Sequence, residues 1–83
     1  MKYILVVFSS RKDAIGFYET LRRANIYSAV VNTPREVTSS CGVSVKIDPK
    51  VLNYVKNAAL CCNSFIAFYM VEEFGIKRKI LKL

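Results

Sequence analysis

The chain has 83 residues, which is enough for one hydrophobic core and leaves no room for a second domain. Hydrophobic residues make up 53% of it, and this high content excludes an intrinsically disordered protein. Histidine is absent, which excludes imidazole as a general base, as a metal ligand and as a switch near neutral pH.

The net charge is strongly positive but unevenly distributed. Lysine and arginine number 13 against 6 acidic residues, and the resulting +7 raises the question of nucleic acid or an anionic membrane as a partner. Four of the basic residues lie within the last seven positions, namely Lys77, Arg78, Lys79 and Lys82. We therefore interpret residues 74–83 as a basic, amphipathic C-terminal tail, either a short helix that docks on a neighbour or an arm for an acidic partner, and we expect neither nucleic-acid nor membrane binding.

The first part of the chain predicts a strand, a helix and a second strand. Residues 3–8 (YILVVF) are β-branched or aromatic without polar interruption, which is typical of a central strand covered on both faces. Ser9 and Ser10 offer a helix cap, and apolar residues at helical spacing predict a helix over about residues 10–24. A second strand is predicted over residues 27–31.

The middle of the chain contains its one polar, turn-forming stretch, residues 32–42 (NTPREVTSSCG), where we expect a functional loop. Alternation of apolar residues predicts a third strand over residues 43–47. Asp48 and Pro49 are typical of a helix start, and an apolar stripe after them predicts a second helix. A fourth strand is predicted over residues 65–71.

This β-α-β-β-α-β order indicates an α+β fold, and in a chain of this size we predict the ferredoxin-like arrangement. It would be a four-stranded antiparallel sheet in the order 4-1-3-2, with both helices on one face, within residues 1–73. Helices cover only one face of such a sheet, yet the first and fourth strands are apolar on both. We therefore expect a second subunit to cover the open face, giving a homodimer or a higher oligomer.

The three cysteines, Cys41, Cys61 and Cys62, indicate free thiols rather than a disulfide scaffold, because their number is odd and adjacent helical cysteines do not bridge easily. The apolar run near the N-terminus is too short for a signal peptide. The uncharged residues 58–71 fall short of the roughly 20 needed to cross a bilayer. We expect a cytoplasmic protein with reduced thiols.

Cys41 is the candidate reactive residue. Free cysteine is usually buried in a strand or helix, whereas Cys41 follows Ser39 and Ser40 in the polar loop and precedes Gly42, which lets another molecule approach. In the predicted sheet the third strand starts beside the end of the first, so the N-terminus of the first helix would favour the thiolate. Arg35 or Lys12 would add positive charge. The alternative is a half-packed loop cysteine without a chemical role.

Cys61 and Cys62 are better explained by core packing, because adjacent residues on a helix face about 100° apart, so at most one of the two joins the apolar stripe and they do not form a chelating pair. A role for them in resolving chemistry at Cys41 is the secondary interpretation. We expect no metal site and no cofactor. The aromatic residues of the strands favour core or interface packing over RNA stacking, since no stretch matches the pattern of RNA-binding sheets.

Residues 30–47 (VVNTPREVTSSCGVSVKI), together with the opening strand and the first helix, resemble the putative selenium/sulfur carrier protein-like family, a small bacterial domain. The resemblance covers roughly residues 2–73 and is most specific over residues 34–42. The carrier cysteine of that family falls on Cys41. The resemblance implies a persulfide or selenopersulfide on Cys41, received from a sulfur or selenium donor protein and passed to an acceptor enzyme.

Together these features predict a carrier or accessory protein rather than a stand-alone enzyme. Cys41 would be the nucleophile, Ser39, Ser40 and Gly42 would shape its loop, and Arg35 would assist electrostatically. The alternative hypothesis is a non-catalytic regulatory module that binds a small ligand or a protein through the loop, with an incidental cysteine.

Overall fold

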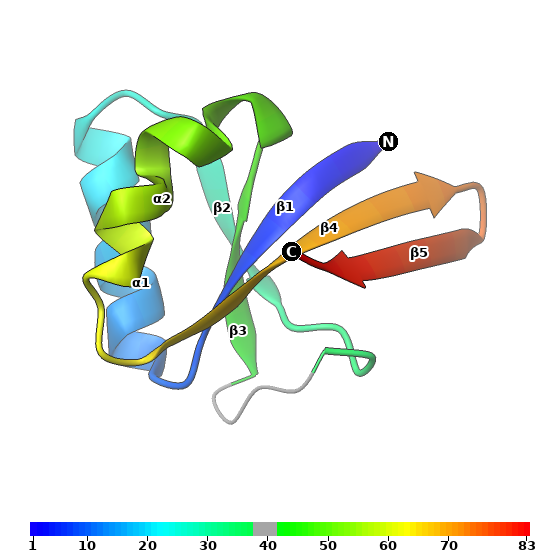
Figure 1. The fold of residues 1–83 in the computed structure, drawn as a ribbon, viewed down its shortest axis with the longest axis horizontal. Helices are drawn as coiled ribbons and strands as arrows, with labels where there is room; N and C mark the ends of the chain where they lie inside the picture. The colour runs from blue at the N-terminus through cyan, green and yellow to red at the C-terminus, as the bar shows by residue number, and fades with distance from the viewer. Residues whose placement is uncertain (38–41) are drawn as a thin grey trace.

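The computed structural model describes residues 1–37 and 42–83. Its elements are β1 (Lys2–Phe8), α1 (Arg11–Arg23), β2 (Ser28–Asn32), β3 (Val43–Ile47), a short 3₁₀ helix (Pro49–Val51), α2 (Leu52–Leu60), β4 (Phe65–Phe74) and β5 (Lys77–Lys82). The strands form one antiparallel sheet in the order β2-β3-β1-β4-β5. Figure 1 shows both helices on the same side of the sheet, while the β4–β5 hairpin extends away from them.

The predicted four-stranded, ferredoxin-like sheet is wrong for this chain, although the α+β class is right and the first four strands are neighbours in the expected order. A fifth strand extends the sheet beyond β4. Gly75, with φ of 61°, is the first residue of a two-residue turn that pairs Phe74 with Lys77, a hairpin geometry that glycine accepts without strain. The basic residues expected in a tail therefore lie in an edge strand, where lysine is well tolerated.

One face of β1 packs against the helices. The residues of this core are Ile4, Val6, Phe8, Ala14, Phe17, Leu21, Val45, Ile47, Val55, Ala59 and Phe68. The ring of Phe8 lies 5.4 Å from that of Phe17 and 6.1 Å from that of Phe65, so these aromatic side chains pack on one another and do not form a stacking surface. Among the described residues no helix is long and apolar enough to cross a membrane.

The other face of β1 is covered by the connection between β2 and β3. Leu5, Val7 and Val71 are buried on this face, and Val37 of the connection packs against them at 4% exposure. The two apolar faces of β1 therefore have an explanation within a single chain. Homo-oligomerisation stays a prediction that a single chain does not test.

Replacing Val37 by alanine should lower the free energy of unfolding by about 2 kcal/mol, because it removes buried methyl groups over Leu5 and Val7. Urea denaturation at neutral pH measures the change. Val30→Ala is the matched control, since Val30 is 39% exposed on an edge strand and should lose less. Equal losses for the two variants would contradict the covering role of the connection.

Candidate functional site

The predicted site lies in the connection between β2 and β3. Cys41, Ser39 and Ser40 fall outside the described residues, so their predicted roles stay predictions. The structure describes the two ends of the connection, residues 33–37 and Gly42. These ends define how the segment that carries Cys41 is attached to the sheet.

Thr33 closes the base of this connection. Its backbone N–H donates to the carbonyl of Gly42 at 2.9 Å, one step beyond the last β2–β3 pair, Asn32 and Val43. The hydroxyl groups of Thr33 and Ser44 are 2.6 Å apart and share a hydrogen bond. Ser44 is completely buried, and this bond satisfies its polar side chain. Both strands therefore continue their pairing to the points where the connection begins and ends.

The next residues turn back over the sheet. The N–H of Val37 donates to the carbonyl of Pro34 at 3.0 Å, which closes a four-residue turn with Arg35 and Glu36 at its centre. Val37 then inserts its side chain against β1 and β4. Arg35 is exposed, as an electrostatic helper toward an incoming anionic group requires, although its distance to Cys41 lies outside what the structure describes.

Glu36 attaches the turn to the edge strand. Nη2 of Arg78 on β5 donates to both carboxylate oxygens of Glu36 at 3.1 Å. Hydrogen bonds from the backbone N–H of Glu36 and from Arg78 lower the pKa of this carboxyl. The same pairing raises the pKa of Arg78. The connection is thus held at two points, apolar at Val37 and ionic at Glu36.

Gly42 follows Cys41 with φ of 72°, in the left-handed region that favours glycine. A Cβ built at this position would meet no atom within 4 Å, so the backbone conformation and not lack of space explains the glycine. The chain therefore re-enters the sheet through a left-handed residue, and the loop-shaping role of Gly42 stays a prediction.

The N-terminus of α1 lies near the end of β1, and Val7 of β1 pairs with Ser44 of β3, so the third strand does start beside the end of the first as predicted, whereas the position of Cys41 relative to the helix stays a prediction. Ser10 caps the helix by accepting a hydrogen bond from the N–H of Asp13 at 3.3 Å. Asp13 accepts a further hydrogen bond from the Ser64 hydroxyl at 2.5 Å. Because a carboxylate already occupies the first turn, α1 offers less positive potential to a nearby thiolate than an uncharged first turn would.

The two described cysteines follow α2. Cys61 is exposed, whereas Cys62 is half-buried, packs against the core beside α1 and lies 3.7 Å from the carbonyl oxygen of Ala58. Burial raises the pKa of the Cys62 thiol, and the negative charge of Asp13 and the Cys61 thiol raise it further. Core packing is thus confirmed for Cys62 but not for Cys61.

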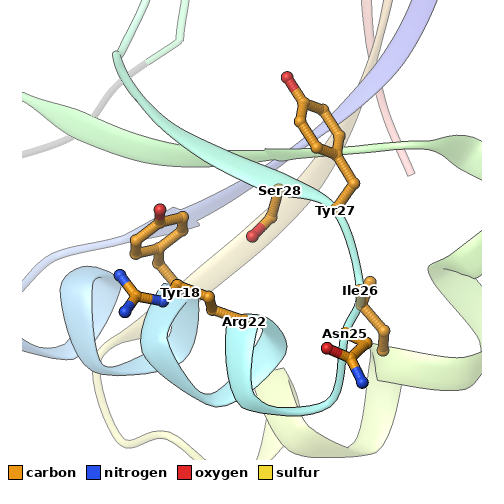
Figure 2. A pocket seen from close by; sticks show the side chains of 6 residues that line it. All are labelled: Tyr18, Arg22, Asn25, Ile26, Tyr27 and Ser28. Atoms are coloured by element: carbon orange, nitrogen blue, oxygen red, sulfur yellow. The ribbon is translucent and has the colours of Figure 1, made fainter.

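A shallow hollow of about 370 Å³ lies at the other end of α1 (Figure 2). Its lining residues are Tyr18, Arg22, Asn25, Ile26, Tyr27 and Ser28. Ser28 begins β2, at the opposite end of that strand from Thr33, and its buried Oγ has no hydrogen-bond partner among the described residues. The hollow holds neither a thiol nor a carboxylate, and it is separate from the predicted site.

Several residues that position the connection are not among the site residues predicted from the sequence. Thr33, Val37 and Arg78 attach it, and Ser44 binds Thr33 from the strand. Val37 carries a usable signal, since it is the one aliphatic residue within residues 32–42. Arg78 gives no such signal, because its contact with Glu36 spans 42 positions.

Residues 1–37 and 42–83 contain no group of three or more cysteine, aspartate or glutamate side chains that could hold a metal ion. Their arrangement defines a small α+β domain that attaches one cysteine-containing connection to its sheet at several points.

Comparison with known families agrees with the resemblance. The model of the family described as "Putative Se/S carrier protein-like" matches residues 2–60, which is well over half of the chain, and the protein belongs to this family. No curated protein and no solved structure gives a significant match. Cys41 lies within the matched residues, whereas Cys61 and Cys62 lie just beyond them.

Glu36→Gln should lower the melting temperature at pH 7 and have no effect in acid. The folded-state pKa of Glu36 lies below its ordinary value of 4.5, so the carboxylate stabilises the fold fully above that pH. This contribution is lost as the pH falls through the lowered pKa. Melting temperatures of both proteins from pH 3 to pH 7 measure it. Glu19→Gln is the control, because Glu19 makes only a 4.0 Å contact with Arg22. A Glu36→Gln effect that is independent of pH would contradict the ionic attachment.

Iodoacetamide should alkylate Cys61 before Cys62, because Cys61 is exposed and the pKa of Cys62 is raised. The rate at Cys62 should reach half of its plateau at a higher pH than that of an unperturbed thiol, whose pKa is about 8.5. Peptide mapping after alkylation at limiting reagent separates the two sites. Faster labelling of Cys62 at neutral pH would contradict the half-buried environment.

Proposed function

We propose that the protein carries sulfur or selenium as a persulfide or selenopersulfide on Cys41 and delivers it to a partner enzyme. The observation that carries this proposal is the position of the cysteines relative to the family match. Of the three cysteines, only Cys41 lies within residues 2–60. A carrier needs one accessible nucleophile, and the family description names carriage of these two elements.

Loading is a thiol exchange that needs no external oxidant. The Cys41 thiolate attacks the terminal sulfur of a persulfide on the donor protein, the donor's S–S bond breaks, and a new S–S bond forms on Cys41. The electron pair of the broken S–S bond stays on the donor cysteine, which leaves as a thiolate. The terminal sulfur is transferred to Cys41 together with its proton. Delivery repeats the exchange with an acceptor thiolate. Selenium follows the same route when it occupies the terminal position.

The attachment of the connection supports this role. Thr33 at its base, Val37 against the sheet and the ion pair of Glu36 with Arg78 of β5 attach the two ends of the connection to the rest of the protein. Gly42 imposes no side chain beside Cys41, and Ser39 and Ser40 add polar groups before it. We assign loop-shaping roles to these three residues and an electrostatic role to exposed Arg35.

The proposed partners are a donor and an acceptor protein, with no cofactor of the carrier itself. Persulfide exchange requires a reduced thiol, so we place the protein in the cytoplasm. The alternative function is a binding module with an incidental cysteine. It would use the same connection between β2 and β3, but it would not need the Cys41 thiol.

Incubation of the pure protein with a cysteine desulfurase and cysteine should add the mass of one sulfur atom, removable by a thiol reductant. Cys41→Ser should abolish this gain, because it removes the nucleophile, whereas the Cys61→Ser/Cys62→Ser double variant should retain it. Intact mass spectrometry followed by peptide mapping measures the gain and its position. Arg35→Gln should slow loading without changing its extent.

A sulfur atom located on Cys61 or Cys62, or a gain that persists in Cys41→Ser, would refute the carrier role of Cys41. The same holds if Cys41 is alkylated by limiting iodoacetamide only after Cys61. Any of these three results would favour the binding-module function.

A further inference from the structure

The hollow at the C-terminal end of α1 lies between the last turn of the helix and the start of β2 (Figure 2). Its volume of about 370 Å³ falls within the range of roughly 300 to 1,000 Å³ that small-molecule pockets occupy. It lies at the opposite end of β2 from Thr33, where the connection to β3 begins. The size of the hollow therefore suits a small organic molecule that binds away from the ends of this connection.

Ser28 brings a buried hydroxyl to the wall of the hollow. Its Oγ has no hydrogen-bond partner among the described residues. Figure 2 shows this side chain on the side of β2 that faces α1, where Tyr18 and Arg22 lie. A buried hydroxyl without a partner destabilises the folded state, and rotation about one side-chain bond turns it toward the hollow. A ligand atom that accepts a hydrogen bond would supply the missing partner.

The other polar side chains of the hollow are also hydrogen-bond donors. Tyr18 offers a hydroxyl and Asn25 a side-chain amide, whereas the guanidinium of Arg22 donates and never accepts. Among the described residues that line the hollow, Arg22 is the one charged side chain. A set of donors with one positive charge and no carboxylate favours a ligand that accepts hydrogen bonds and carries negative charge.

Arg22 is available to such a ligand. Its Nη1 lies 4.0 Å from a carboxylate oxygen of Glu19, and 70% of its side chain is exposed. An exposed ion pair at this distance contributes little to stability, so the guanidinium can leave it at small cost. A carboxylate or phosphate group in the hollow would instead accept two parallel hydrogen bonds from the guanidinium.

The C-terminus of α1 does not prevent an anion from binding here. A helix C-terminus carries partial negative charge because its last carbonyl groups lack partners. In α1 the carbonyls of Thr20, Leu21 and Arg22 accept hydrogen bonds from the backbone N–H groups of residues 24–26. Asn25, with φ of 60°, turns the chain so that these bonds form. The guanidinium of Arg22 is therefore the dominant charge at the hollow.

Tyr18 and Ile26 give the hollow an apolar wall. Both side chains are partly buried and pack against the core between the helices and the sheet, which fixes their positions. The Tyr27 side chain differs, because it is 80% exposed and points away from α1 in Figure 2. A ligand that fills the hollow therefore needs an apolar part beside its anionic group.

We propose that this hollow binds a small organic anion. The carboxylate or phosphate group of the ligand accepts hydrogen bonds from Arg22, Tyr18 and Ser28, and its apolar part lies against Tyr18 and Ile26. The proposal does not depend on Cys41, so it holds whether or not this residue carries sulfur or selenium.

NMR titration of the isotope-labelled protein with benzoate, phenyl phosphate and benzylamine tests the proposal. The two anions should cause saturable shifts of the backbone amide signals of residues 18–28, and the one that binds more tightly identifies the preferred anionic group. Benzylamine is a cation of similar size and should cause none. Arg22→Gln should weaken binding of the anions by about tenfold or more. Arg23→Gln is the matched control, because Arg23 is an exposed arginine of the same helical turn that does not line the hollow, and its affinity should stay within about twofold of the native value.

Two further variants separate a lost ligand contact from a damaged fold. Glu19→Gln should strengthen binding, because it removes the carboxylate that competes for Arg22. Ser28→Ala should weaken binding and yet raise the melting temperature, because it removes an unpartnered buried hydroxyl. Cys41→Ser should bind the anions like the native protein. Equal losses in Arg22→Gln and Arg23→Gln, saturable shifts of the same signals with benzylamine, or no shifts with either anion would overturn the proposal.

Discussion

The burial of β1 on both faces is the constraint on which the rest of the structure depends. Residues 4–8 are at most 1% exposed, although side chains along a strand alternate between opposite faces of the sheet. Two different coverings are therefore needed. α1 and α2 supply one of them, and the β2–β3 connection supplies the other through Val37. Val37, which lies in a stretch whose composition suggests a free surface loop, is thus part of the hydrophobic core.

The sequence is informative where a local pattern has one physical solution. The run of apolar residues in β1 and the Asp48-Pro49 helix start predict their elements correctly, because each pattern acts over a few neighbouring residues. The sequence is misleading at residues 77–82, where the charge suggests a solvated tail. A strand at the edge of a sheet has the same composition as such a tail, and only pairing with β4 distinguishes the two.

Some features of the candidate site are also predictable from the sequence, whereas others depend on the fold. The positive φ of Gly42 and the proximity of β3 to the end of β1 follow from turn chemistry and from strand order, which the sequence carries. The attachment of Glu36 to Arg78 depends on the existence of β5, so an analysis that assigns a tail does not find it. The carboxylate of Asp13 in the first turn of α1 is visible in the sequence, yet its effect on thiol chemistry needs the fold to be known.

The central position of β1 also has a consequence during synthesis. β1 precedes both of its neighbours in the chain: β3 begins at Val43, and β4 does not end until Phe74. The most apolar strand of the protein must therefore leave the ribosome well before either neighbour exists. Residues 3–8 of this strand are uncharged and have high β propensity, and such a segment is prone to assemble with copies of itself before its neighbours are available. Pairing across this sequence separation is also slow to form, which lengthens the time during which β1 is exposed.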